Sequence, residues 1–144
     1  MKYFFLLFFL LSPLSFANNS VLTYGHSVVE LKGTLDLQTF PGPPNYESIQ
    51  DGDAIERHFY LKLDKSIDVL LKKENSDIEN PENERNVNII QLSIAEKDDK
   101  LWNRLQKLGK GGHVQIEGTL FHRFNGHHHS RILMVVTGIK VDIP

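Results

Sequence analysis

Four histidines near the C-terminal end offer the side chains best suited to chemistry in this sequence. They flank Asn125-Gly126, the pair that most favours a two-residue hairpin turn. With that turn, Phe124 is opposite His127 and His122 is opposite His129. Strand alternation then places Phe124, His122, His127 and His129 on one face. This predicts that the three imidazoles approach one point.

Three imidazoles in this arrangement are typical of a divalent-metal site. Opposed residues on paired strands have Cβ atoms about 5 Å apart, and diagonal ones about 7 Å. We therefore predict His122, His127 and His129 as candidate ligands of Zn, Cu or Ni, with a fourth position open as in catalytic zinc sites. Alternatively, the hairpin is a polar loop whose rings stack on aromatic side chains and hydrogen-bond to a facing loop, the candidate partners being Phe121, Phe124, Tyr46, Asn45, Glu47 and Asp51.

The facing loop is a second unusual segment, Phe40 to Asp53, which is rich in proline and glycine. Its consecutive prolines remove amide donors and fix the backbone, so the segment is expected to be stiff and irregular. Its carboxylates can complete a metal shell or orient imidazoles, although Asp51-Gly52-Asp53 is more typical of a turn. Across the two loops we predict ligand-binding side chains at Asn45, Tyr46, Glu47 and His128. His58 and His113 are interpreted as strand-end histidines without a role.

Hydrophobic periodicity predicts the elements that carry these loops. Alternating apolar residues indicate strands over 28–37, 58–63 with a continuation to 71, 87–94, 114–120 and 132–141. One helix is predicted after Asp98, because Leu101, Trp102, Leu105 and Leu108 share a helical face and Gly109 suits its C-cap. Lys72 to Arg85 is polar and is expected to be an exposed connection.

The order β-β-β-α-β-β predicts a mainly β fold, a five-stranded OB-type Greek-key barrel with its helix between strands three and four. Gly33 and Gly118 occupy matching positions in the first and fourth strands, where they suggest bends that help the sheet to close. An antiparallel sheet packed on one helix is the alternative. In an OB-fold, the loops joining strands one to two and four to five border the ligand face, so Phe40–Asp53 and Asn125–Ser130 are expected to meet.

The N-terminal segment indicates export. Lys2 precedes an apolar run from Tyr3 to Leu11, and Ser15-Phe16-Ala17 is the small-x-small pattern of a signal-peptidase site. We expect a signal peptide over residues 1–17, an N-terminal extension over 18–27 and a single OB-like domain over 28–144. The mature protein is then periplasmic or secreted, and it has no membrane anchor after cleavage.

Composition excludes several function classes. The chain has no cysteine, which excludes thiol, redox-disulfide and iron–sulfur chemistry. Its formal net charge is −2, and an acidic balance does not attract phosphate backbones. The sequence also lacks a nucleophile elbow, a phosphate loop and a zinc-protease helix motif. A histidine-bound metal water is therefore the only catalytic route that we predict.

Two motifs resemble a known family. Phe40-Pro41-Gly42-Pro43-Pro44-Asn45-Tyr46-Glu47-Ser48-Ile49 is one, and Gly118-Thr119-Leu120-Phe121-His122 with Asn125-Gly126-His127-His128-His129 is the other. Over roughly Val28 to Ile139 the chain resembles the exported bacterial proteins named domain of unknown function 4431. The resemblance implies a bacterial periplasmic protein and brings no established activity. Members of that family often have histidine where this chain has Phe124, which implies a weaker set of histidine ligands here.

We favour a non-enzymatic binding or accessory module whose two loops recognise a small molecule, a glycan or an envelope protein. A divalent-metal-binding protein or metal-dependent hydrolase is the alternative. Single-stranded nucleic-acid binding is disfavoured by export and by the acidic balance.

Overall fold

The computed structural model describes residues 19–25, 27–71, 82–95 and 98–141, so the predicted signal peptide and most of the Lys72–Arg85 connection lie outside the described residues. The elements, in chain order, are β1 (Ser20–Thr23), β2 (Val29–Pro41), β3 (Ile55–Leu70), β4 (Glu84–Ser93), α1 (Asp99–Leu108), β5 (His113–His122) and β6 (Ile132–Val141). Within the described residues, no helix is long and apolar enough to span a bilayer.

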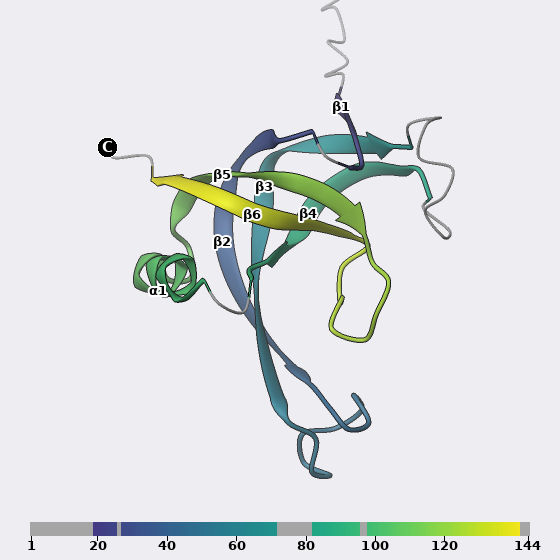
Figure 1. Cartoon of the computed structure of the whole chain (residues 1–144), viewed down its shortest axis with the longest axis vertical. Coiled ribbons are helices and arrows are strands. Elements are labelled where there is room, and N and C mark those ends of the chain that lie inside the picture. Colours follow the sequence, from purple (N-terminus) through teal and green to yellow (C-terminus); the bar gives the residue numbers. More distant parts are fainter. Residues whose placement is uncertain (1–18, 26, 72–81, 96–97, 142–144) are drawn as a thin grey trace, which may run out of the picture.

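Five strands close into a barrel (Figure 1). The sheet runs β3-β2-β5-β6-β4, and a further pairing of β3 with β4 closes it. Only β4 and β6 among these are parallel, with Gln91 opposite Leu133. Because α1 lies between the third and fourth barrel strands, the connectivity is that of the predicted OB-type barrel. The alternative of an open antiparallel sheet is wrong.

A short strand precedes the barrel. Residues of β1 pair in parallel with Ile67 to Leu70 at the C-terminal end of β3. The sequence predicted only an extension here, because four residues are too few for a periodic pattern to be recognised. Tyr24, which follows β1, is almost fully buried in the core.

The barrel interior is filled by apolar side chains that alternate along the strands, as their period of two requires. α1 adds Leu105, which has no exposed surface, and Trp102, whose ring meets the ring of Phe59 edge-on at 5.0 Å. The predicted helix ends are confirmed. The Asp98 carboxylate accepts a hydrogen bond from the Leu101 amide at 3.0 Å, and Gly109 has a φ of 65° at the C-terminal end.

The two matching glycines lie where backbones approach closely. A Cβ added to Gly33 would be 2.1 Å from the Lys62 carbonyl oxygen, and one added to Gly118 would be 2.1 Å from the Val135 carbonyl oxygen. The register between β5 and β6 shifts at Gly118. Gly118 therefore provides the predicted bend, since a side chain there would collide with the neighbouring strand.

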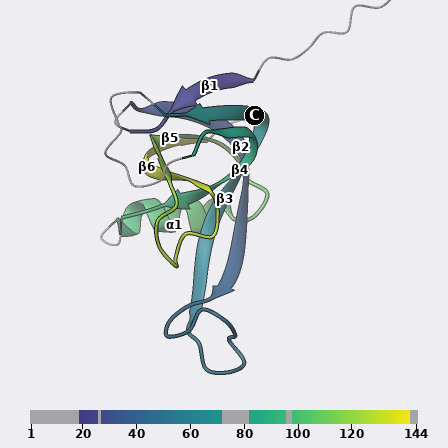
Figure 2. The ribbon, with the colours of Figure 1, turned by 90° about the vertical axis from the view of Figure 1, so that its right-hand side faces the viewer.

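β2 and β3 continue beyond the barrel as a two-stranded arm (Figures 1 and 2). In this arm Phe40 is opposite Glu56 and Gln38 is opposite His58, so these side chains share one face of the ribbon. The arm ends in the β2–β3 loop, residues 42–54. The β5–β6 loop, residues 123–131, lies alongside the arm.

Candidate functional site

The β5–β6 loop does not form the predicted two-residue turn. The ladder between β5 and β6 ends at His122 opposite Ile132, and one further bond joins the Arg123 amide to the Arg131 carbonyl. Asn125 instead accepts a hydrogen bond from the His127 amide through its own side chain at 3.0 Å. Such a local side-chain bond favours a different turn. The predicted pairing of Phe124 with His127 and of His122 with His129 is therefore wrong.

Gln91 explains why the chain leaves the hairpin path. This β4 side chain is 2% exposed. Its Nε2 donates to the His127 carbonyl at 2.8 Å, while its Oε1 accepts from the amides of His129 and Ser130 at 2.7 and 3.2 Å. These bonds supply the backbone partners that a two-residue hairpin would have provided within the ladder. A buried polar residue of another strand thus fixes the loop.

The loop histidines separate into different environments. His122 Nε2 lies 3.6 Å from Glu84 Oε1, and its ring meets Tyr24 edge-on. His127 Nδ1 and His129 Nε2 lie 2.6 and 3.7 Å from the two carboxylate oxygens of Glu56. The structure therefore brings His127 and His129 together at one carboxylate and places His122 at another.

His128 follows the alternative prediction of ring stacking. Its Nδ1 accepts a hydrogen bond from the Phe124 amide at 3.1 Å, and its ring meets Phe124 and Phe121 edge-on. Burial, assisted by the neighbouring histidines, lowers the pKa of His128, which keeps its ring neutral at pH 7.

The carboxylate that gathers the imidazoles is Glu56, at the start of β3. His58, two residues later on the same strand face, lies with its Nε2 3.1 Å from Glu56 Oε2. One ligand atom each of Glu56, His58 and His129 lies within 4.8 Å of the other two, a grouping that could hold a metal ion. The sequence signal for this pair was the Glu-x-His spacing beside buried Phe59, but His58 was interpreted as a strand-end histidine.

Burial and hydrogen bonding shift the pKa values of Glu56 and His129 in this cluster. Burial works to raise the pKa of Glu56, but hydrogen bonds from His58 and His127 outweigh it and lower that pKa. Burial is also the main reason why the pKa of His129 is lowered. The cluster thus contains a carboxylate that stays charged and, in His129, an imidazole that favours the neutral form that binds metals.

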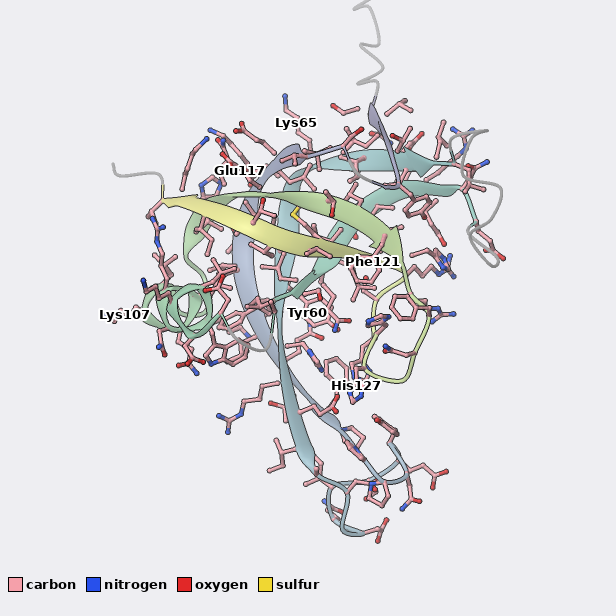
Figure 3. All side chains as sticks on the ribbon, in the orientation of Figure 1. Tyr60, Lys65, Lys107, Glu117, Phe121 and His127 are labelled. Carbon is pink, nitrogen blue, oxygen red and sulfur yellow. The ribbon has the colours of Figure 1, made fainter. Side chains whose placement is uncertain are left out.

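The two loops meet, as predicted. The Tyr46 hydroxyl lies 3.2 Å from His127 Nε2 and the two rings meet edge-on. Because Glu56 is ionised, His127 Nδ1–H donates to it, which leaves His127 Nε2 to hydrogen-bond with the Tyr46 hydroxyl. Figure 3 shows His127 reaching from its loop toward the β2–β3 arm.

The acidic residues of the β2–β3 loop form a turn and do not join the imidazoles. The Asp53 carboxylate accepts hydrogen bonds from the amides of Ser48, Glu47 and Asn45 at 2.8–2.9 Å. These bonds lower the pKa of Asp53. The predicted Asp51-Gly52-Asp53 turn is therefore confirmed, whereas the side chains of Asn45 and Glu47 are exposed at the tip of the arm.

A cleft of about 660 Å³ opens between the arm, the β5–β6 loop and the start of α1. Glu56 and His58 form part of its wall, and Trp102 forms another part. The remaining lining includes Arg57, Asp98, Asp99, Asn125, His127 and His128. A second, more apolar cavity of about 470 Å³ lies at Tyr24, Phe121, His122, Phe124, His128 and Val135.

Comparison with known proteins gives a family and no activity. Residues 89–140 match the model of a family described as a domain of unknown function (DUF4431). The match spans the second half of β4, all of α1, β5 and the β5–β6 loop, and β6 up to residue 140. It therefore includes the second of the two sequence motifs and leaves the first outside. Neither the curated proteins nor the solved structures gave a match.

Proposed function

We propose, from the site itself, that the protein is an exported binding module that holds a small polar ligand between its two loops. The family matched by residues 89–140 is described without an activity. The contact of the two loops beside the cleft carries this proposal. Tyr46 of one loop and His127 of the other lie 3.2 Å apart, and His127 also lines the cleft.

The size and place of the cleft support ligand binding. Ligand pockets commonly have volumes of about 300–1,000 Å³, which includes the 660 Å³ measured here. OB-type barrels bind oligonucleotides and oligosaccharides between these same two loops. The architecture therefore leaves two main ligand classes to distinguish.

The charge of the cleft lining distinguishes between oligonucleotides and oligosaccharides as ligands. Glu56, Asp98 and Asp99 line the cleft, and Arg57 is the one lysine or arginine in its described lining. Such a surface repels phosphate backbones. A glycan suits it better, because Trp102 contributes an aromatic ring to the lining, and the acidic and amide groups can form hydrogen bonds with hydroxyls.

The N-terminal sequence supports export. The positive Lys2, the apolar run and Ser15-Phe16-Ala17 form a signal-peptide pattern. In an extracytoplasmic compartment a glycan is an available ligand. Mass spectrometry of protein recovered from the extracytoplasmic fraction should give a chain that begins at Asn18; a chain that retains Met1 in the cytoplasm would contradict export.

Nuclear magnetic resonance tests the ligand. Soluble oligosaccharides released from the envelope of the producing cell should shift amide signals around the cleft, and a single-stranded oligonucleotide should not. The shifts should be lost in Trp102→Ala and weakened in Arg57→Ala, which is exposed and so should not disturb folding. Phe124→Ala is the matched aromatic control, because Phe124 lines the second cavity and is not among the residues that line the cleft. No shift with any oligosaccharide fraction, or equal shifts with the oligonucleotide, would overturn the proposal.

A further inference from the structure

One buried nitrogen beside Glu56 lacks a partner among the described residues. His129 Nε2 is buried and makes no hydrogen bond, although it lies 3.7 Å from Glu56 Oε2. That oxygen already receives His58 Nε2 at 3.1 Å. Buried polar atoms are nearly always satisfied, since an unmade hydrogen bond costs about 1–3 kcal/mol. An electron-pair acceptor that binds Glu56, His58 and His129 together would also give His129 Nε2 a partner.

The spacing of the three side chains fits such a group. Zinc binds imidazole nitrogen and carboxylate oxygen at about 2.0–2.2 Å, so tetrahedral ligands lie about 3.4 Å from one another. The distances from Glu56 Oε2 to the two imidazole nitrogens are 3.1 and 3.7 Å, on either side of that value. All three ligand atoms lie within 4.8 Å of one another. A change of at most about 1.4 Å in the separation of the two imidazole nitrogens, with smaller changes at Glu56, would complete the geometry.

Neighbouring residues hold each ligand in place. The His129 ring stacks on Phe40 with centroids 3.9 Å apart and an interplanar angle of 3°, and its backbone amide donates to Gln91. The second carboxylate oxygen of Glu56 receives His127 Nδ1 at 2.6 Å, which leaves Oε2 directed at the imidazoles. Metal ligands are characteristically oriented by outer hydrogen bonds of this kind.

We propose that Glu56, His58 and His129 form a binding site for one divalent transition-metal ion of the zinc class, open toward the cleft. Two imidazoles and one carboxylate are the donors of zinc, copper and nickel sites, whereas calcium and magnesium prefer oxygen ligands throughout. Three protein ligands leave a further coordination position for water or a bound molecule. Glu56 and His58 line the cleft, so two of the three ligands are reached from it, whereas His129 lies outside its lining. This inference goes beyond the proposed glycan binding and does not depend on it.

The ligand set differs from the one that the hairpin predicted. His122 was a predicted ligand, but its Nε2 lies beside Glu84. His127 was another, but it contacts the outer oxygen of Glu56 and so acts as a positioning residue. His122→Ala is therefore a matched control, since it removes an imidazole from the same segment without touching the proposed site.

Calorimetric titration of tag-free protein with ZnCl₂, without any glycan, tests the site. We expect one ion per chain with a Kd of about 1 μM or tighter, and no comparable binding of Ca²⁺ or Mg²⁺. Glu56→Gln, His58→Ala and His129→Ala should each raise the Kd by at least about 100-fold, beyond the 10- to 100-fold typical of outer-shell changes. His122→Ala should leave the Kd unchanged.

Nitrogen-15 spectra of the imidazoles identify the ligands in the unaltered protein. Zinc should shift the Nε2 signals of His58 and His129 and leave those of His122 in place. If an alanine variant fails to unfold cooperatively, Glu56→Gln carries the test, because it keeps the side-chain volume and an oxygen for His127. No zinc binding by the unaltered protein, full affinity in Glu56→Gln, or an equal loss in His122→Ala would each overturn the assignment.

Discussion

Replacement of Gln91 by leucine removes the side chain that fixes the histidine loop. Gln91 is 2% exposed and makes three hydrogen bonds of 2.7–3.2 Å to the loop backbone. Leucine has a similar size and is apolar, so the substitution tests these hydrogen bonds with little change in packing volume. His129, a proposed metal ligand, is one of the residues whose backbone is released.

The expected cost follows from those three bonds. Each intramolecular hydrogen bond contributes about 0.5–1.5 kcal/mol, and a backbone group left buried without a partner costs about 1–3 kcal/mol. The exposed part of the loop can turn some of the released groups toward water, which limits the second cost. We therefore expect the free energy of unfolding to fall by about 2–3 kcal/mol. Zinc affinity should fall by about 10- to 100-fold, because the His129 ring loses its fixed position.

Urea unfolding, hydrogen exchange and zinc titration together measure these effects. Gln115→Leu is the control, since Gln115 donates to Glu30 at 2.7 Å on an exposed strand face; its effect should stay within about 0.5 kcal/mol. In Gln91→Leu the amides of His129 and Ser130 should lose protection from exchange. A fall in stability below about 0.5 kcal/mol, with those amides still protected, would refute the idea that Gln91 shapes the loop.

Three further results are expected. Gly118→Ala should lower the free energy of unfolding by about 1–3 kcal/mol, because its Cβ would lie 2.1 Å from the Val135 carbonyl oxygen. Gly126→Ala, whose Cβ would make only ordinary contacts, should change the free energy of unfolding little. Equal effects of the two variants in urea unfolding would contradict the argument from close backbone approach. Leu105→Ala should cost about 2–5 kcal/mol by urea unfolding, since this side chain has no exposed surface, and a loss below 1 kcal/mol would show that α1 is not part of the core. Hydrogen bonds lower the folded-state pKa of Asp53, so the stabilising effect of its carboxylate is complete above the unfolded-state pKa of about 3.9 and is lost as the pH falls through the folded-state pKa. Below about pH 4 the melting temperature should therefore decline more steeply in the unaltered protein than in Asp53→Asn. Parallel curves of melting temperature against pH would contradict this account.

Local patterns were sufficient to predict the framework. Alternation of apolar residues located all five barrel strands, and the spacing of Leu101, Trp102 and Leu105 located α1. These signals are reliable because each depends on neighbours within one turn or a few strand residues. The matching positions of Gly33 and Gly118 also pointed to sites of close backbone approach, which the barrel requires.

The histidine loop shows where such patterns fail. Asn125-Gly126 strongly favours a two-residue turn in isolation, but the loop forms bonds with Gln91, more than thirty residues earlier in the chain. A buried side chain with three hydrogen bonds, each contributing about 0.5–1.5 kcal/mol, outweighs the local turn preference. The histidines therefore occupy positions other than those that the two-residue turn predicted, and the candidate metal ligands in the structure differ from the predicted set.

The sequence by itself determined the strand and helix positions, the barrel order and the meeting of the two loops, because periodicity and connection lengths are properties of the chain. Only the tertiary structure decided which side chains face one another across those loops. Glu56 and His58 reach His129 because barrel closure and the β2–β3 arm bring β3 beside the β5–β6 loop. Contacts between residues so far apart in sequence depend on the packed arrangement of several strands, and no local spacing of residue types specifies them.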